Sequence, residues 1–310
     1  ALALCYLFKM NFGEQIWHNG KLVPTQDAMV HCMSHATHYG SGAFEGIRYY
    51  NTDNGPAVFK LREHMERLLY SGSVIELESE HSVDALCEAT LETIRANPFE
   101  DGYIRPIIFY GADKLGLNPA GNPCETAIAV MPWGKYLSDD PIEVGLCPYV
   151  RIHPKSLVSD AKISGHYVNS TLSNQWAKKH KYHEALLLDF EGNLAEGPGE
   201  NLFMIKDGTL YTPKLGSILP GITRATIMDL AQKELRVETI EKTLTMDDLM
   251  ASDEAFYTGT AAEVTIIGSI DRTPIGDQSN EISGKLKKIY ADVVTGKMEQ
   301  YHEWLSFTEN

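Results

Sequence analysis

The sequence predicts an α+β protein of two domains, on three observations. Its 310 residues exceed one ordinary hydrophobic core and suggest two domains of roughly 130 to 170 residues each. Strand-like apolar runs and amphipathic helical segments both recur along the chain. Polar, turn-forming residues fill the stretch from Pro132 to Pro141, between two strand-like runs. We therefore expect a small N-terminal α/β domain at residues 10–132, an interdomain loop at 133–141 and a larger C-terminal domain at 142–310.

The N-terminal half is expected to begin with a hairpin and to continue through strands and two helices. Asn19-Gly20 is the dipeptide that a tight primed turn requires, which predicts the hairpin at residues 16–23. Ser82 is a preferred N-cap, and Pro98 ends the helix that Ser82 begins. The other expected elements are strands at 46–50 and 57–61, a helix at 62–76, and apolar strands at 103–110 and 126–130.

The C-terminal half is expected to hold a meander of strands and several helices. Thr245-Met-Asp-Asp has the pattern of a capped helix start. A long amphipathic helix from about Ile282 is expected to close the chain. The other expected elements are strands at 142–150, 184–190, 194–196, 202–205, 209–212, 255–258 and 264–270, and helices at 168–180 and 223–235.

Composition and charge exclude several classes of partner. A hydrophobic content of 43% with 22% charged residues is typical of a soluble globular protein. The formal net charge of -15 argues against nucleic acid and against an anionic membrane, because either partner needs a basic face. No run of about 18 apolar residues is present to span a membrane. The five cysteines show no Cys-x-x-Cys spacing, which predicts reduced thiols and a cytoplasmic protein.

Residues 1–9 are not expected to belong to the natural protein. They are apolar, but they lack the basic segment and the cleavage site of a signal peptide. We expect Met10 to be the natural start and residues 1–9 to come from an upstream misread or from cloning.

Three histidines raise the question of a metal site. His31, His35 and His38 have spacings of four and three, which place them on one face if the segment is helical. No acidic ligand stands among them, and Ser34 or Thr37 is equally able to cap a helix start. We predict no bound metal.

Lys162 is the strongest candidate for covalent chemistry. Ser164 and Gly165 leave room for a bulky planar group to approach its ammonium, and Tyr167 offers a phenol five residues on. A lysine that forms a Schiff base must be partly neutral near pH 7, which burial or nearby positive charge achieves by lowering its pKa. The ordinary alternative is a solvated loop lysine.

Two glycine-containing segments are candidate anion sites. Gly221-Ile222-Thr223 lies where a helix begins, so backbone N–H groups and a hydroxyl point outward at the positive end of the helix dipole. Gly259-Thr260-Ala261 offers a second loop whose N–H groups a carboxylate or phosphate can approach. Neither fits a nucleotide-binding fingerprint. The alternative for the first segment is a plain capped helix.

Glu196 is a candidate partner for a heterocyclic nitrogen. It stands at a strand end just before glycines, where a carboxylate can face a cleft, although a surface turn is the commoner setting. A carboxylate beside a pyridine nitrogen keeps that nitrogen protonated, and pyridinium is the electron sink that pyridoxal phosphate uses to stabilise a carbanion. Arg67, by contrast, stands four residues after Glu63 and suggests an ordinary helical ion pair.

Eight motifs in this order give the chain a specific resemblance. Together they resemble the branched-chain amino acid aminotransferases, pyridoxal 5'-phosphate enzymes of fold type IV whose larger domain holds a pseudo-barrel sheet. The match covers nearly everything from Ile16 to about Leu305. The motifs are His38-Tyr39-Gly40, Phe44-Glu-Gly-Ile-Arg48, Tyr103-Ile-Arg105-Pro, Pro132-Trp-Gly, Ala161-Lys162, Glu196-Gly-x-Gly-Glu-Asn-Leu-Phe203, Leu219-Pro-Gly-Ile-Thr-Arg224 and Gly259-Thr-Ala-Ala-Glu263.

The resemblance implies a role for each matching residue. Lys162 would be the Schiff-base lysine and proton shuttle, Glu196 the partner of the pyridinium nitrogen, and Tyr167 the partner of the ring oxygen. The phosphate would be held by Arg67, Ile222, Thr223 and Thr260. The substrate carboxylate would be received by Tyr103, Thr260 and Ala261.

The same resemblance implies how the substrate side chain is bound. Arg48 and Arg105 would accept the second carboxylate of glutamate. The apolar side chain would be walled by Phe44 and Tyr136, with Tyr39 and Leu117 from a neighbouring subunit. A homodimer or a multiple of one follows.

The expected activity is transfer of the amino group between L-leucine, L-isoleucine or L-valine and 2-oxoglutarate, with ping-pong kinetics. Within the same fold type, the alternatives are a D-amino acid or (R)-amine transaminase and an aminodeoxychorismate lyase. A third alternative is an acidic binding protein without catalysis, in which Lys162 is a structural ion-pair partner.

Overall fold

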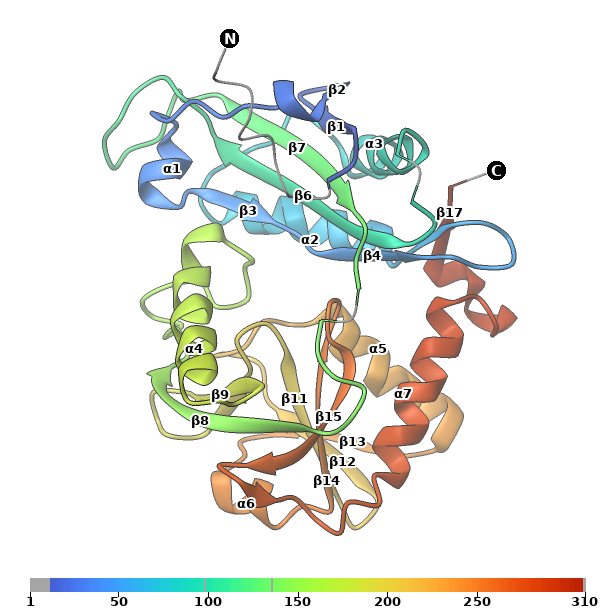
Figure 1. Cartoon of the computed structure of the whole chain (residues 1–310). Coiled ribbons are helices and arrows are strands. Elements are labelled where there is room, and N and C mark those ends of the chain that lie inside the picture. Colours follow the sequence, from blue (N-terminus) through green and yellow to red (C-terminus); the bar gives the residue numbers. More distant parts are fainter. Residues whose placement is uncertain (1–11, 98, 135, 309–310) are drawn as a thin grey trace.

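Two β-sheets, each covered by helices, organise the chain in the computed structural model (Figure 1). The structure describes residues 12–97, 99–134 and 136–308, so the expectation about Met10 lies outside the described residues. One sheet is built mainly by the first part of the chain, and the other lies below it in Figure 1. The segment that joins β7 to β8 runs between the two sheets.

The first sheet is antiparallel throughout its described pairings. Asn19 and Gly20 both have positive φ, of 48° and 93°, as the tight turn between β1 and β2 requires. Its strand order, with β3 paired beside β6, is β17 (Leu305–Phe307), β5 (Ala57–Phe59), β4 (Ile47–Tyr50), β6 (Gly102–Tyr110), β7 (Cys124–Met131), β1 (Gln15–His18) and β2 (Lys21–Pro24), and β3 spans Gly42–Phe44.

Two helices cover one face of this sheet. Helix α2 (Leu61–Ser73) buries Leu61, Met65 and Leu68, whose spacing is that of one helical face, and it packs on β3 and β6. Helix α3 (Val83–Arg95) packs on β1 and β7, and its N-cap Ser82 accepts a hydrogen bond from Ala85 N as the sequence predicted. From α2, Ser71 contacts Lys162 and Arg67 contacts Pro220.

The second sheet closes into the expected pseudo-barrel. Strands β10, β9, β8, β15, β14 and β11 pair in turn, and the pairing of Glu196 with Asn201 joins β10 back to β11. Strands β12, β13 and β16 extend this sheet outside the ring. The bounds are β8 (Ile142–Val150), β9 (Glu184–Leu188), β10 (Leu194–Glu196), β11 (Asn201–Lys206), β12 (Thr209–Pro213), β13 (Thr239–Lys242), β14 (Glu254–Gly259), β15 (Glu263–Ile270) and β16 (Thr273–Pro274).

Helices surround the pseudo-barrel and complete its core. Helix α4 (Tyr167–Lys179) packs on β8 and β9, whereas α5 (Ile222–Leu230) packs on β14 and α7 (Glu281–Val294) on β14 and β15. Helix α6 (Met246–Met250) has the capping box that the sequence predicted at Thr245. Short helical turns occupy Thr25–Asp27, His35–Tyr39 (α1), Ser164–His166, Ala231–Leu235 and Glu299–Trp304.

The end of the chain corrects one expectation. The long helix does not close the chain, because a helical turn and strand β17 follow α7, and β17 pairs with β5 of the first sheet. A hydrophobic cluster accompanies this return, with Tyr50 and Phe59 from the first sheet, Phe256 from the second and Tyr290 from α7. The two sheets therefore share buried apolar contacts.

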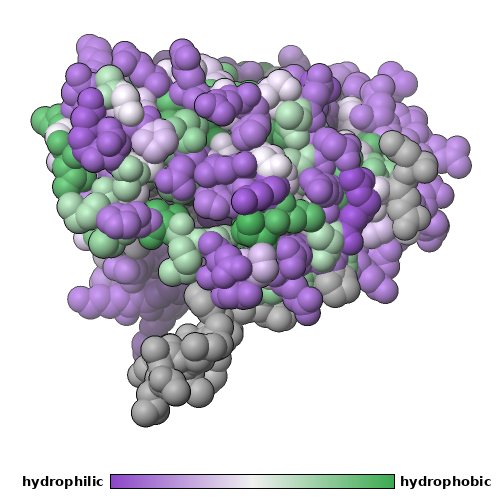
Figure 2. Space-filling view, turned by 90° about the horizontal axis from the view of Figure 1, so that it is seen from above, coloured by the Kyte–Doolittle hydropathy of each residue, from purple (hydrophilic) through white to green (hydrophobic). Residues whose placement is uncertain are grey.

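The surface agrees with the polar composition. Seen from the side of the first sheet, hydrophilic residues cover much of the molecule, with hydrophobic residues between them (Figure 2). Within the described part of the chain, no helix has the length and apolar character needed to cross a membrane.

Candidate active site

Lys162 lies between the two sheets and is fixed by its backbone. Its N–H donates to Ser71 Oγ at 2.8 Å, and its carbonyl accepts from Phe44 N at 3.1 Å. The side chain then reaches Tyr167, where Nζ donates to the phenol oxygen at 2.5 Å. Nζ also stands 5.1 Å from the centre of the Phe44 ring. An exposed loop lysine has none of these contacts, so that alternative is wrong.

Two glycines allow the segment that carries Lys162 to pack closely against the end of α1. Gly40 adopts φ +65°, and a Cβ there would stand 2.7 Å from Gly165 Cα. Gly165 N donates to Gly40 O at 3.0 Å, which docks the Lys162 segment against the end of α1.

One cavity collects most of the predicted site residues around Lys162. Its lining also includes Trp133, Glu200 and Asn201, which were not among the predicted site residues. The predicted residues that line it are Phe44, Arg67, Tyr103, Arg105, Tyr136, Lys162, Tyr167, Ile222, Thr223, Thr260 and Ala261.

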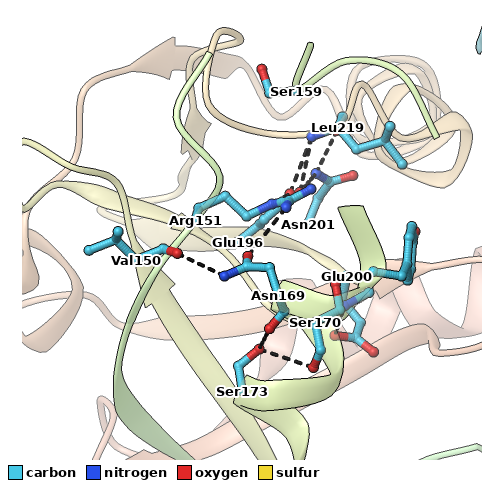
Figure 3. A network of polar contacts seen from close by, with 12 residues as sticks. Val150, Arg151, Ser159, Asn169, Ser170, Ser173, Glu196, Glu200, Asn201 and Leu219 are labelled. Carbon is cyan, nitrogen blue, oxygen red and sulfur yellow. Dashed lines mark hydrogen bonds and ion pairs between the residues drawn. The ribbon is translucent and has the colours of Figure 1, made fainter. Parts of the chain in front are cut away.

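Glu196 lies at the end of β10, beside this cavity, and is held on both of its oxygens (Figure 3). Arg151 Nε donates to Oε1, Asn201 Nδ2 donates to Oε2 at 2.9 Å, and Leu219 N approaches both oxygens at 3.3 and 3.2 Å. Burial raises the pKa of the Glu196 carboxyl, and the Arg151 guanidinium opposes that shift. The surface-turn alternative for Glu196 is wrong, because only 4% of the residue is exposed.

The N-terminus of α5 forms one end of the cavity. Gly221 is its N-cap and makes no side-chain capping bond, so the first N–H groups, including those of Ile222 and Thr223, are not capped by a side chain. Unpaired helix N–H groups attract anions, and α5 has nine residues to sum its dipole.

Arg67 reaches the same end of the cavity from α2. Its Nη1 donates to Pro220 O at 3.1 Å, and its Nε and Nη2 donate to Glu45 at 2.6 and 2.9 Å. The helical ion pair with Glu63 is wrong, since Glu63 pairs with Lys60 at 2.8 Å.

Two arginines predicted to act together are separated. Arg105 lines the cavity, with its guanidinium carbon 4.9 Å from the Phe44 ring centre and 5.2 Å from that of Tyr103. Its Nε is buried and has no hydrogen-bond partner among the described residues. Arg48 instead donates to Glu263 at 2.9 Å and lines a neighbouring hollow, so the structure does not bring it into the cavity.

Two predicted pocket residues lie outside the cavity of this chain. Tyr39 is 45% exposed and Leu117 is 87% exposed, and neither lines the cavity. Both had been predicted to act on a neighbouring subunit.

The three histidines do not share one helical face. Helix α1 begins at His35, so His31 precedes it. His35 is buried between Ser41 Oγ at 2.6 Å and Gly116 O at 2.8 Å, and His38 contacts Cys32 O at 3.1 Å. Among the residues that the structure describes, no three His, Cys, Asp or Glu side chains gather as metal ligands.

Several polar residues of the site were missed from the sequence. Glu45 and His64 are buried beside Arg67, Arg151 is buried beside Glu196, and Glu200 lines the cavity. Glu45 and Glu200 do stand within two of the quoted motifs, which was the only available signal. His64 and Arg151 carry no such signal, because their partners lie 19 and 45 residues away along the chain.

Comparisons with known proteins match this arrangement. The model of the family Amino-transferase class IV matches residues 42–270. The branched-chain-amino-acid aminotransferase of Pseudomonas aeruginosa is 42% identical over 294 residues, covering 93% of this chain and 95% of the relative. A crystal structure of the branched-chain aminotransferase from Thermoproteus uzoniensis with norvaline superposes with a TM-score of 0.92 at 39% identity, covering 96% of this chain and 99% of that one.

A second solved structure is of a holo form. The branched-chain amino acid aminotransferase from Thermobaculum terrenum in its PLP form has a TM-score of 0.92 and 32% identity, over 97% of this chain and 100% of that chain. Sequence and structure agree over nearly the whole length. The chain therefore belongs to the class IV aminotransferases and, among them, to the branched-chain-amino-acid aminotransferases.

Proposed function

We propose that the protein moves the amino group between L-branched-chain amino acids and 2-oxoglutarate, with pyridoxal 5'-phosphate as its cofactor. The observation that carries this is one cavity in which Lys162, the uncapped start of α5 and the side chain of Arg105 meet. A reactive amine, a phosphate site and a site for a distal carboxylate are what this reaction needs.

The residues present fit the proposed cofactor. Its phosphate would lie at the N–H groups of Ile222 and Thr223, with Arg67 and Thr260 beside them. Glu196, held beside the cavity by Arg151 and Asn201, would face the ring nitrogen. The bound cofactor supplies an electron sink for the carbanion that forms at the substrate α-carbon.

Each side chain then has a defined task. Lys162 would take the proton from the substrate α-carbon and deliver a proton to the C4' carbon of the cofactor. Tyr167, which holds Nζ at 2.5 Å, would keep the amine in place and donate to the ring oxygen. Tyr103 and the N–H groups of Thr260 and Ala261 would bind the α-carboxylate of the substrate.

The side-chain pocket would accept both apolar and acidic substrates. Trp133 stacks on Tyr103 at 4.4 Å between ring centres, and Tyr136 continues the stack at 6.4 Å. These rings and Phe44 suit an aliphatic side chain, whereas Arg105 suits the second carboxylate of glutamate.

Assembly and location are part of the proposal. The exposed Tyr39 and Leu117 would complete the pocket of a second subunit, which makes the protein a homodimer or a multiple of one. The free thiols of Cys32, Cys87, Cys124 and Cys147 favour the cytoplasm.

The test is a spectroscopic titration of wild type and Lys162→Ala, each loaded with pyridoxal 5'-phosphate. We expect L-leucine to convert the visible band of the wild-type protein and 2-oxoglutarate to restore it, because each half reaction changes the cofactor. Lys162→Ala should fail to complete this cycle. Lys155→Ala, which removes an exposed lysine, should behave as wild type. A wild-type band that L-leucine leaves unchanged would contradict the substrate class, and D-alanine, (R)-amines and aminodeoxychorismate would be tested next.

A further inference from the structure

A buried carboxylate lies next to the proposed phosphate site, which is an unusual neighbour for an anion. Glu45 follows β3 and has no exposed surface. It accepts from Arg67 Nε at 2.6 Å, from Arg67 Nη2 at 2.9 Å and from His64 Nδ1 at 2.8 Å. Burial alone would raise the pKa of this carboxyl, but Arg67 and His64 hold its pKa well below the usual range. Glu45 is therefore an anion.

Its charge works against the binding of a phosphate. A carboxylate close to Arg67 offsets the positive charge that a phosphate would otherwise meet. The charge of Glu45 therefore does not explain its position beside Arg67. The orientation that it imposes on the Arg67 guanidinium does. A guanidinium has five N–H groups in a fixed fork.

Counting the donors of Arg67 shows what the carboxylate achieves. Nε and one N–H of Nη2 are taken by Glu45, and one N–H of Nη1 is taken by Pro220 O at 3.1 Å. Three of the five are used, so one N–H on each terminal nitrogen remains. Arg67 lines the cavity beside Thr223 and Ile222, and two N–H groups on adjacent nitrogens suit the oxygens of one phosphate.

Helix α2 carries this arrangement together with the lysine contact. His64, Arg67 and Ser71 are spaced so that they share one face of α2. Ser71 Oγ accepts from the backbone N–H of Lys162, while His64 and Arg67 hold Glu45. Glu45 in turn adjoins Phe44, whose ring packs 4.7 Å from that of Tyr167. The Glu45 carboxylate therefore connects the β3–β4 junction to α2. The same helix contacts the Lys162 segment through Ser71 and lines the cavity through Arg67.

We propose that Glu45 is a positioning residue that clamps the Arg67 guanidinium so that its two remaining N–H groups face the bound phosphate. This rests on the proposed function for the identity of the phosphate ligand, but not for the clamp itself. Glu45 touches neither the ligand nor the reacting atoms. Its effect passes entirely through Arg67.

Two substitutions separate position from charge. Glu45→Asp keeps the negative charge but shortens the side chain, so it loses the two-oxygen contact with Arg67. Glu45→Gln keeps the length but loses the charge, and it turns an amide donor towards the donors of Arg67 or His64. If Glu45 acts only through its charge, Asp leaves binding unchanged and Gln strengthens it. If Glu45 positions Arg67, both substitutions weaken binding.

The experiment measures the dissociation constant of pyridoxal 5'-phosphate for the apoprotein by fluorescence quenching, and that of inorganic phosphate by protection against thermal unfolding. We expect both constants to rise about tenfold or more in Glu45→Gln and Glu45→Asp, as when a charged hydrogen-bond partner is lost. In an Arg67→Ala background the same substitutions should change neither constant by more than about twofold. With saturating cofactor, the KM for L-leucine should stay within about twofold of wild type.

Glu254→Gln is the matched control. Glu254 is 5% exposed and accepts bonds from Ile282 N, Ser283 N and Ser283 Oγ at the start of α7, away from the residues that line the cavity. It should alter thermal stability without altering either dissociation constant. Unchanged or tighter binding in either Glu45 variant would overturn the proposal, and so would equal weakening in Glu254→Gln. A wild type that binds inorganic phosphate but not pyridoxal 5'-phosphate would overturn the proposed function alone.

Discussion

Glu200 is a buried acid that lines the cavity without a cationic partner in its described hydrogen bonds. Only 4% of it is exposed, and Gly199 N donates to it at 3.0 Å. Burial, followed by the nearby Glu184 carboxylate, raises the pKa of Glu200 from 4.5 to about 8. Near neutral pH its carboxyl is therefore mostly protonated in the folded chain.

This shift predicts a pH dependence of stability. Between pH 4.5 and 8 the folded protein keeps a proton on Glu200 that the unfolded chain releases. The free energy of unfolding must therefore fall as the pH rises, by at most about 1.4 kcal/mol per pH unit from this group. We expect Glu200→Gln to lose part of this decline in urea unfolding of the apoprotein between pH 5.5 and about 8.5. Glu184 retains its own contribution in this variant.

Exposed Glu191 provides the comparison. Glu191→Gln should leave the slope of unfolding free energy against pH as in wild type. Parallel curves for wild type and Glu200→Gln would show that Glu200 is ionised in the folded protein.

Arg105 and Arg48 differ in whether their side chains line the cavity. Both have a buried Nε without a described partner, but Arg105 lines the cavity, whereas Arg48 donates through Nη1 to Glu263 and lines the neighbouring hollow. We expect Arg105→Ala to raise the KM for 2-oxoglutarate about tenfold or more, with a smaller rise for 4-methyl-2-oxopentanoate, which has no second carboxylate. Arg48→Ala should affect both oxo acids similarly. Steady-state kinetics with L-valine as amino donor measure this, and an equal loss on both oxo acids in Arg105→Ala would argue against the assignment.

At the scale of elements, the sequence predicted helices and turns correctly where their capping residues or their hydrophobic periodicity were strong. Thr245 and Asp248 form a reciprocal capping box, with Asp248 N donating to Thr245 Oγ1 at 3.2 Å and Thr245 N donating to Asp248 Oδ2 at 2.8 Å. The hairpin at Asn19-Gly20 was found in the same way. Such features depend on residues a few positions apart, which a sequence displays directly.

The capping box gives a prediction for α6. Thr245→Ala should lower the free energy of unfolding by about 1 kcal/mol, because it leaves Asp248 N without its cap. Thr243→Ala, an exposed neighbour with no described side-chain hydrogen bond, should change it by less than about 0.5 kcal/mol. Urea unfolding measures both, and equal effects would mean that the capping bond contributes nothing specific to stability.

Other elements gave no local signal. Strand β13 has no buried residue, and the alternation of apolar and polar residues in β17 covers only three residues, which is too short to predict a strand. Both form because a partner strand brought from elsewhere in the chain completes them, β12 for β13 and β5 for β17. The ion pairs of Glu45 with Arg67 and of Glu196 with Arg151 were missed for the same physical reason. In each pair the two residues lie far apart in the sequence and meet only after the chain has folded.

At the scale of the whole molecule, most of the arrangement followed from the resemblance rather than from periodicity. The pseudo-barrel closes through one described pairing, between Glu196 and Asn201, which no alternation of apolar residues predicts. We still propose a division into a small domain, a loop at 133–141 and a large domain. Strand β17 is the exception that ties the end of the chain to the small domain, and the shared cluster around Phe59 and Tyr290 accompanies it.

The closing pair of the pseudo-barrel also bears on engineering. Because side chains alternate across a strand, a one-residue slip of β10 against β11 at this pair would turn Glu196 away from the side on which Arg151 and Asn201 hold it. This seam, the Glu196–Asn201 pair and the turn between them, should therefore keep both its length and its two end residues, because Glu196 and Asn201 belong to the proposed site. The loop that carries Trp133 and Tyr136 lies between β7 and β8, outside the strands of the ring, and its described residues form no strand whose register must be kept. Libraries that aim at new amino acid substrates should vary the length of that loop and leave the seam untouched.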